Sequence, residues 1–256
     1  MQLKSTEQMN ALREGGERLE NVMQEVIKAV CAGVSTAELD DIADRAIRQY
    51  EGIPIFKGYG EEFGKPFPAS ICTSINDEVV HGIPRKDRII QEGDLVKIDM
   101  GMRFDGMVTD MARTVAVGAV SDEAARLVRV TEESLLRGIS AVRIGAKLSD
   151  YARAVQKHVE ENGFSVVRDL VGHGVGFDLH EPPQIPNYFF AGMKDASFRP
   201  GMAVAFEPMV NAGGYEVCLG KDGWVFMTED GRLSAHFEDT VIITDQGVEV
   251  VTRSGK

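Results

Sequence analysis

Four acidic residues and one histidine stand in segments where apolar side chains dominate. Each acid lies within or directly after an apolar run typical of a β-strand, and the histidine lies in the glycine-rich stretch GHGVG. Acidic side chains are rarely buried without a partner, so several of them in such strands imply a shared cation. The candidate ligands are Asp99, Asp110, His173, Glu207 and Glu238.

The chemistry of this set favours two divalent metal ions. Two such ions would balance the negative charge of the four carboxylates. Mostly oxygen ligands with one imidazole suit Mn²⁺, Fe²⁺, Co²⁺ or Zn²⁺. A lone histidine in a glycine-rich turn more often makes an ordinary hydrogen bond, and it is the acids that favour a metal-binding role for His173. An imidazole must be neutral to bind a metal, so affinity is expected to fall from about pH 6.5 downward.

The stretch VKIDMGMRFDGMVTDMAR, residues 96–113, supplies the first two acids. Two apolar runs flank Asp105-Gly106, a pair typical of a two-residue hairpin turn. Such a hairpin would place Asp99 and Asp110 nearly opposite each other, where like charges repel unless a cation lies between them. Taken alone, the hairpin is equally consistent with two exposed, solvated carboxylates that bind no cation.

Four helices are expected from hydrophobic periodicity and capping signals. Two of them begin at capping boxes, in which a serine is followed three residues later by glutamine or glutamate. The expected helices start near Ser5 and Ser35 and cover residues 121–139 and 148–161. The segment 182–200, which contains proline and aromatic residues, is expected to be a loop.

This pattern of two helices followed by strands occurs twice. Glycines that precede helices, end helices or open strands recur 108 to 112 residues later, and the aligned strands end in Asp99 and Glu207. The common offset favours a duplicated helix-helix-sheet unit with pseudo-twofold symmetry over a solenoid, which would need more copies. We therefore expect a single catalytic domain over residues 1–256, with half-repeats at roughly 5–118 and 121–245.

Composition argues against several classes of partner. The net charge of −12 disfavours non-specific binding to nucleic acids or anionic membranes. The three cysteines are far apart and form neither a disulfide framework nor a metal motif, which indicates a reducing cytoplasm. Neither a signal peptide nor a membrane-spanning run is recognisable. We expect a soluble cytoplasmic protein without nucleic-acid or membrane partners.

The motifs that carry the candidate ligands resemble those of type I methionine aminopeptidases. Asp99 and Asp110, GHGVG with His173, FEPMV with Glu207 and SAHFED with Glu238 occur in the order typical of this family, and the resemblance covers nearly the whole chain. It implies the duplicated α/β (α+β) pita-bread fold with antiparallel sheets. It also implies a dinuclear methionyl aminopeptidase that removes N-terminal methionine from new polypeptides with a small second residue, by metal-activated hydroxide attack.

The resemblance assigns a role to each metal ligand. Asp110 and Glu238 would bridge the two ions. Asp99 would bind only one of them, and His173 and Glu207 would bind the other. The identity of the two ions stays open among Mn²⁺, Fe²⁺, Co²⁺ and Zn²⁺.

The resemblance also implies catalytic and substrate-binding residues. Glu207 would be the general base, His81 would contact the scissile amide, and His180 would donate a hydrogen bond to the substrate carbonyl oxygen. Leu179 stands where an aromatic residue is common in the family, so the pocket is expected to have its own shape. The walls of the methionine pocket would be Phe67, Cys72, Leu179 and Trp224.

Three other classes of protein compete with this interpretation. X-Pro aminopeptidases and dipeptidases of the same fold usually carry an additional N-terminal domain, for which this chain has no room. A non-catalytic peptide-binding homologue typically loses metal ligands, whereas all five are present. A dinuclear phosphoesterase would be expected to have a phosphate-binding loop, and GHGVG lacks the lysine of that motif.

The resemblance and the composition together imply a limited set of partners. The implied partners are the N-termini of nascent polypeptides, with association with the ribosome left open. The protein is expected to be a monomer.

Overall fold

The structure is a computed structural model that describes residues 3–61 and 64–253. Its four α-helices confirm the helices expected from the sequence. They are α1 (Thr6–Ala29), α2 (Thr36–Gln49), α3 (Asp122–Ala141) and α4 (Leu148–Glu161). In the described part of the chain, no helix combines the length and the apolar character that crossing a membrane requires.

Local sequence explains where the first two helices begin. The Ser5 side chain accepts a hydrogen bond from the backbone N–H of Gln8, whose own side chain accepts one from the backbone N–H of Ser5. Ser35 and Glu38 form the same reciprocal pair at the start of α2. Each pair satisfies two backbone donors that would otherwise lack partners.

Nine strands form one large sheet in which all pairings are antiparallel. Strand β2 (Cys72–Ile75) also pairs with β4, and β15 (Gly247–Val250) also pairs with β14. The main path runs through β1 (Ile53–Pro54), β4 (Leu95–Phe104), β5 (Met107–Ala116), β14 (Glu238–Thr244), β9 (Ala203–Phe206), β7 (Gly172–Gly174) and β8 (Glu181–Ile185).

Two small antiparallel sheets complete the fold. One contains β13 (Ser234–His236), β10 (Met209–Asn211) and β6 (Ser165–Val166). The other contains β11 (Val217–Leu219), β12 (Phe226–Thr228) and β3 (Glu78–Val80).

The expectation of a loop over residues 182–200 is wrong at its beginning. Residues up to Ile185 belong to β8, although Pro182 and Pro183 lie within it. Strand β8 is the last strand of the main path and has a ladder partner on one side only. Proline lacks a backbone N–H, and such an edge position tolerates it because the outward-facing donors need no partner strand.

The hairpin expected around Asp105-Gly106 is confirmed, with a different register for the two acids. Phe104 pairs with Met107, and the two turn residues have φ values of +45° and +76°, which a type I′ turn requires. Asp99 pairs with Ala112, while Asp110 pairs with Gly101. The two carboxylates are therefore diagonal neighbours on one face of the ribbon, two positions from direct opposition.

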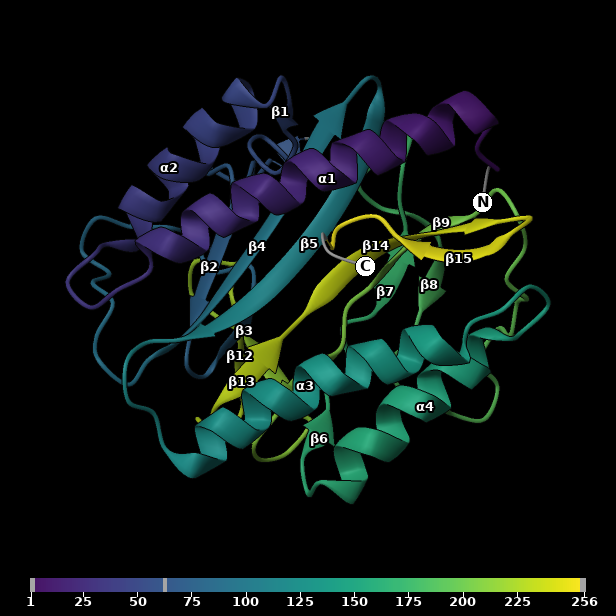
Figure 1. The fold of residues 1–256 in the computed structure, drawn as a ribbon. Helices are drawn as coiled ribbons and strands as arrows, with labels where there is room; N and C mark the ends of the chain where they lie inside the picture. Colours follow the sequence, from purple (N-terminus) through teal and green to yellow (C-terminus); the bar gives the residue numbers. More distant parts are fainter. Residues whose placement is uncertain (1–2, 62–63, 254–256) are drawn as a thin grey trace.

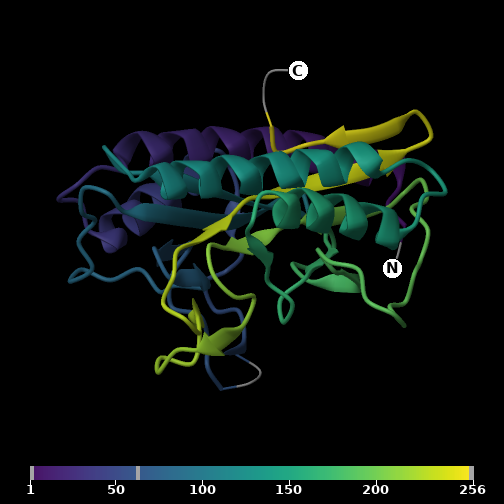
Figure 2. The ribbon, with the colours of Figure 1, turned by 90° about the horizontal axis from the view of Figure 1, so that it is seen from below.

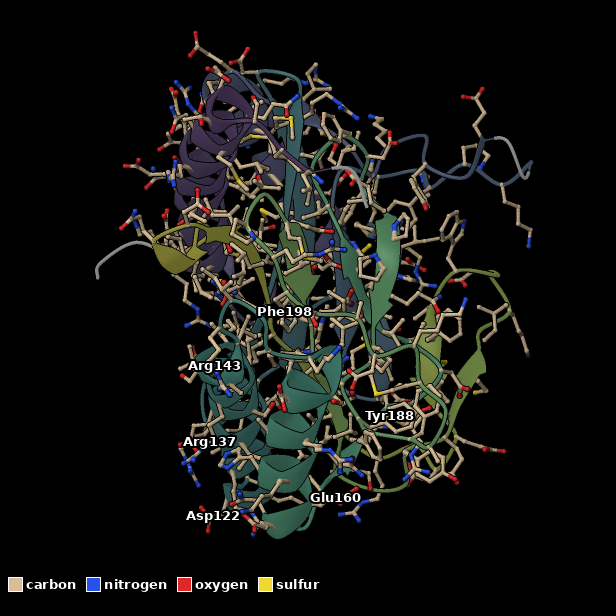
Figure 3. The ribbon with its side chains drawn as sticks, turned by 90° about the vertical axis from the view of Figure 1, so that its right-hand side faces the viewer. Asp122, Arg137, Arg143, Glu160, Tyr188 and Phe198 are labelled. Carbon is tan, nitrogen blue, oxygen red and sulfur yellow. The ribbon has the colours of Figure 1, made fainter. Side chains whose placement is uncertain are left out.

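All four helices lie on the same side of the large sheet (Figures 1 and 2). The pair α1 and α2 packs on β4 and β5 around Leu19, Leu39 and Ile98, whereas α3 and α4 cover a second apolar core. In Figure 3 charged residues of the second pair, such as Glu160, lie at the edge of the molecule, while the fully buried Phe198 lies toward its centre. The opposite face of the sheet, which these four helices do not cover, is available for a functional site.

Candidate metal centre and active site

Five neighbouring strands of the large sheet each bring one predicted metal ligand to the same place. In the order β4, β5, β14, β9 and β7 they supply Asp99, Asp110, Glu238, Glu207 directly after β9, and His173. All five side chains line one cavity of about 70 Å³. Segments far apart in the chain therefore meet because their strands are adjacent in the sheet.

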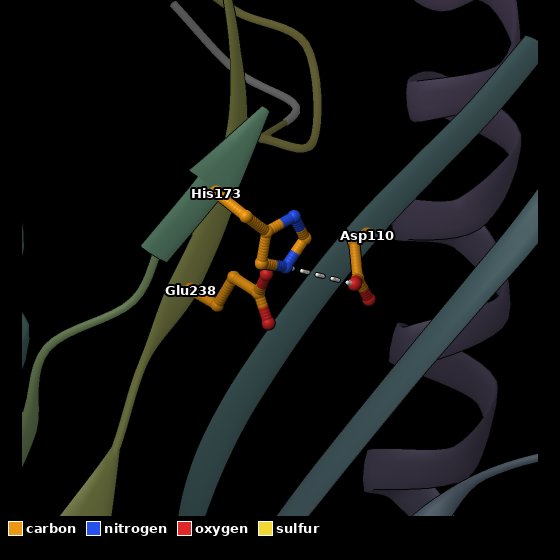
Figure 4. A group of neighbouring side chains, drawn as sticks. All are labelled: Asp110, His173 and Glu238. Atoms are coloured by element: carbon orange, nitrogen blue, oxygen red, sulfur yellow. Dashed lines mark ion pairs between the residues drawn. The ribbon is translucent and has the colours of Figure 1, made fainter. Parts of the chain in front are cut away.

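The distances between these side chains suit ligands of a common ion. His173 Nε2 lies 3.3 Å from Glu207 Oε1 and 3.9 Å from Asp110 Oδ2, and Figure 4 shows the imidazole between Asp110 and Glu238. Ligand atoms about 2.1 Å from one ion lie at most about 4.2 Å apart. His173 Nδ1 donates to the carbonyl oxygen of Gly174 over 3.0 Å, which leaves Nε2 free to bind a metal.

The four carboxylates pay a large desolvation cost in the metal-free protein. Burial raises the pKa of Asp99 to about 7 and that of Glu207 to about 8. Burial, followed by repulsion from neighbouring carboxylates, raises the pKa values of Asp110 and Glu238 well above the ordinary range. A cluster of this kind favours protonated acids unless a cation is bound.

Unpartnered oxygens show that the cluster fits divalent metal ions. Asp99 Oδ1, Asp110 Oδ1 and Glu238 Oε1 are buried and have no hydrogen-bond partner within residues 3–61 and 64–253. Buried polar atoms are normally paired, so three orphaned oxygens at one point require an explanation. Carboxylate oxygens with imidazole nitrogen are the donor set that Mn²⁺, Fe²⁺, Co²⁺ and Zn²⁺ accept.

Two further histidines predicted as site residues lie beside the cluster. His81 lines the same cavity, and its φ of +62° is rare for a residue with a side chain. Burial lowers its pKa to about 4. His180 also lines the cavity, with its ring 4.3 Å from that of His173, and desolvation lowers its pKa. Both imidazoles are therefore neutral near pH 7.

The predicted apolar walls lie in the same cavity as the ligands. Phe67 and Trp224 pack edge to face at 5.2 Å between ring centroids, and Phe67, Cys72 and Leu179 are buried. The rings, thiol and isobutyl group form a soft apolar surface that suits a thioether side chain. The four residues predicted as pocket walls all line this cavity: Phe67, Cys72, Leu179 and Trp224.

Two residues of the cavity were not predicted as site residues. Phe56 adds to the apolar wall, and the Tyr59 hydroxyl lies 2.6 Å from Nδ1 of His180. Both belong to an irregular segment after β1, where no hydrophobic periodicity indicates which way a side chain points. The aromatic content of the segment was the only available signal.

A wider groove adjoins the cluster. Its volume is about 440 Å³. His81, His173, His180 and Glu207 line both the groove and the small cavity. A ligand could thus place one side chain in the apolar cavity and continue past the histidines into the groove.

The backbone that carries the acids is fixed by buried hydrogen bonds. Thr240 Oγ1 donates to the carbonyl oxygen of Asp110 and accepts from its N–H, each over 2.8 Å. The Arg113 guanidinium donates to the carbonyl oxygen of Glu238 over 2.6 Å. These contacts hold β5 and β14 together where Asp110 and Glu238 project, and so help to fix the ligand positions.

Comparison with known proteins agrees with this site. Residues 10–245 match the model of metallopeptidase family M24. The methionine aminopeptidase of Clostridium acetobutylicum and methionine aminopeptidase 1 of Bacillus subtilis are each 44% identical over 250 residues, which are 98% of this chain and 98% of each relative. The crystal structure of methionine aminopeptidase from Thermotoga maritima is 37% identical, with a TM-score of 0.94 over 99% of this chain and 100% of that one.

The chain therefore belongs to metallopeptidase family M24, and its mixed α/β architecture with a curved antiparallel sheet is the pita-bread fold predicted from the sequence. Within M24 its relatives at 44% identity over nearly the full length place it among the methionine aminopeptidases.

Proposed function

We propose that this protein is a metal-dependent aminopeptidase that removes the N-terminal methionine from new polypeptides with a small second residue. The observation that carries the proposal is the joint position of two features. A buried carboxylate and histidine cluster lines a small cavity that also has apolar walls, and a wider groove shares some of the same residues. The cavity would take the methionine side chain, and the groove would take the remaining peptide.

The finer assignments are those that the resemblance implies for the residues of this cluster. Asp110 and Glu238 would bridge two divalent ions, Asp99 would complete the site of one, and His173 and Glu207 that of the other. Both ions would be Mn²⁺, Fe²⁺, Co²⁺ or Zn²⁺. When bound, such ions polarise the scissile carbonyl and make a water molecule more acidic.

The residues of the chain would complete the reaction. Glu207 lies between the cavity and the groove, where its carboxylate can accept a proton from the attacking water and pass it to the leaving amine. His180 can donate a hydrogen bond to the carbonyl oxygen as that atom gains negative charge. His81, held in place by its unusual backbone conformation, can contact the scissile amide nitrogen.

We further propose that the protein acts as a monomer in the cytoplasm on the N-termini of nascent chains, with association with the ribosome left open. The three unpaired cysteines and the net charge of −12 support this setting.

A substrate panel tests the proposed reaction against its rivals. Purified protein loaded with Co²⁺ or Mn²⁺ would be offered a Met-Ala peptide, an X-Pro peptide and a phosphoester. We expect release of methionine from the first alone, with full loss of activity after chelation. Turnover of the X-Pro peptide or the phosphoester in place of the Met-Ala peptide would refute the proposal, as would full activity in exhaustively metal-free protein.

Metal loading is expected to release protons near neutral pH. At about pH 6.5 Asp99 and Glu207 are largely protonated in the metal-free protein, because their pKa values are about 7 and about 8. A metal ion must displace those protons, so its affinity should rise with pH up to about pH 8. His173, with a pKa of about 3, is already neutral in this range. The expected loss of metal affinity at acidic pH is therefore controlled by the carboxylates and not by the histidine, to which the sequence analysis had attributed it.

Calorimetric titration with Zn²⁺ in two buffers of different ionisation enthalpy measures the number of protons released. An equal apparent enthalpy in both buffers at about pH 6.5 would contradict the expected protonation of the carboxylates.

Removing the Tyr59 hydroxyl is expected to lower turnover by roughly 2- to 10-fold. If this hydroxyl donates to His180 Nδ1 across the 2.6 Å contact, the imidazole proton resides on Nε2, where it can reach a substrate oxygen. One hydrogen bond contributes about 0.5–1.5 kcal/mol, which corresponds to that range of rates. The variant Tyr59→Phe keeps the ring. Tyr50→Phe is the control, since its hydroxyl contacts Glu25 between α1 and α2, and equal effects of the two changes would refute the assignment.

A further inference from the structure

A buried ion pair joins Lys4, which precedes α1, to Glu181, the first residue of β8. Lys4 Nζ lies 2.7 Å from Glu181 Oε2, with the Lys4 side chain fully buried and only 9% of the Glu181 side chain exposed. Burying two charges carries a desolvation cost that an exposed pair avoids. Glu181 also lines the wider groove beside the metal cluster, so a role of the pair in the reaction is a reasonable question.

Glu181 stands at the end of a loop that carries two residues of the active site. Gly174 of β7 pairs with Glu181 of β8, which makes residues 175–180 the connection between the two strands. This loop holds Leu179, a wall of the small cavity, and His180, the proposed donor to the substrate carbonyl oxygen. The position of both side chains therefore depends on the conformation of this connection.

The Glu181 carboxylate uses each of its oxygens to hold the loop in place. Oε1 accepts hydrogen bonds from the backbone N–H groups of Phe177 and Asp178, over 2.5 and 3.2 Å. Oε2 is bound by Lys4, whose ammonium also lies 5.0 Å from the centroid of the Phe177 ring. Hydrogen bonds to an ionised group are stronger than those between neutral groups. The carboxylate thus links the turn that precedes His180 to Lys4.

Lys4 is itself fixed to the large sheet. Its backbone N–H donates to the carbonyl oxygen of Gly201, just before β9, over 2.8 Å. The lysine side chain also packs closely on the loop, since a Cβ atom added to Gly176 would lie 2.5 Å from Lys4 Cε. Lys4 is therefore held both at its backbone and at its ammonium, and it connects the loop to the start of β9.

We propose that Lys4 and Glu181 are positioning residues that hold His180 in place for the reaction. This inference rests on the proposed function, in which His180 donates to the substrate carbonyl oxygen. Tyr59 contacts the imidazole itself across 2.6 Å, whereas the ion pair fixes the backbone from which the imidazole projects. A misplacement of about 1 Å can lower a rate about 10²-fold, and the ion pair prevents such a misplacement.

The variant Lys4→Met removes the ammonium and keeps an unbranched side chain. In Co²⁺-loaded protein with a Met-Ala peptide, we expect kcat to fall at least about 10-fold while metal per chain stays unchanged. Arg13→Met is the control, because it removes a cation of α1 that pairs with Glu249 of β15 over 2.7 Å. This control should keep the wild-type kcat, and a wild-type kcat in Lys4→Met would overturn the proposal.

A double-mutant cycle distinguishes positioning of His180 from general destabilisation. In the His180→Ala background, Lys4→Met should lower kcat by less than about 2-fold, because the imidazole that the pair positions is already absent. An equal fall in both backgrounds would show that Lys4 acts by another route, and would overturn the proposal.

The paired variant Lys4→Met/Glu181→Gln serves if the single variant fails to fold, since it leaves neither buried charge without a partner. The glutamine still offers an oxygen to the N–H groups of Phe177 and Asp178, but the connection to Lys4 is absent. We expect kcat to stay at least about 10-fold below that of the wild type. Recovery of the wild-type kcat would show that only an unpaired charge was harmful, which overturns the proposal.

Proton NMR of the metal-free protein follows the imidazole without any turnover. The ring C–H signals of His180, assigned by their loss in His180→Ala, should shift or broaden in Lys4→Met, while those of His158 on α4 stay unchanged. Unchanged His180 signals would overturn the proposal. If the Co²⁺-loaded wild-type protein does not cleave the Met-Ala peptide, the proposed function fails together with this inference. An active wild type with an equally active Lys4→Met variant overturns the inference alone.

Discussion

Replacing Glu238 by alanine is expected to empty both metal positions and to abolish aminopeptidase activity. The described chain contains two triads of potential ligands, Asp110–His173–Glu238 and Glu207–His236–Glu238, and Glu238 alone belongs to both. Its buried Oε1 has no hydrogen-bond partner among the described residues. Loss of a bridging carboxylate weakens both metal sites at once. It also removes a negative charge that offsets the repulsion between the two cations. Asp110→Ala should have a similar effect, because the resemblance assigns Asp110 the same bridging role.

Asp99→Ala should be milder, since Asp99 would bind a single ion and belongs to neither triad. Elemental analysis of metal per chain compares the three variants with Asp41→Ala, which removes an exposed carboxylate from α2. We expect nearly no metal for Glu238→Ala and Asp110→Ala, about one ion per chain for Asp99→Ala, and wild-type content for the control. An equal loss of metal in all three variants would contradict the bridging assignment.

Local sequence patterns were sufficient to predict the elements that carry the ligands. The turn pair Asp105-Gly106 specifies a hairpin because both residues must adopt positive φ. Ser5 and Ser35 specify helix starts through their capping boxes. Acids within apolar strands indicated a buried cation, since burial without a partner is costly.

Register and strand order were less accessible from sequence. The diagonal arrangement of Asp99 and Asp110 differs from the near opposition expected, although it follows by counting from the predicted two-residue turn. Strand β8 was missed because the sequence does not reveal that it lies at a sheet edge, where Pro182 and Pro183 are tolerated. The adjacency of β14 and β9 is a long-range pairing that no local pattern specifies.

The contacts around the cluster were the least predictable part of the site. Tyr59 lies in an irregular segment, and its hydrogen bond to His180 depends on the path of that segment through space. His236 lies two positions before Glu238 in the sequence, which does not show where its ring lies. Its approach to Glu207 depends on the pairing of β13 with β10, which places His236 opposite Met209.

Replacing His180 by alanine is expected to lower turnover by about 10²- to 10³-fold while leaving metal content nearly unchanged. His180 is assigned as a donor to the substrate and belongs to neither triad of ligands. Its Nδ1 is engaged by Tyr59, so Nε2 is the nitrogen available to a substrate oxygen. The carbonyl oxygen gains charge during attack, and a fixed N–H therefore stabilises the transition state more than the substrate.

Turnover, the Michaelis constant and metal per chain distinguish this role from its alternatives. For His180→Ala we expect a lower kcat with little change in KM, as removal of a donor to the transition state predicts. His81→Ala should also keep its metal and should lose less activity, because contact with the amide nitrogen assists the leaving group rather than the developing oxyanion. Loss of metal in His180→Ala would show that His180 is a ligand. Wild-type turnover would instead assign this imidazole to the exposed rim of the groove, where it would have no part in the reaction.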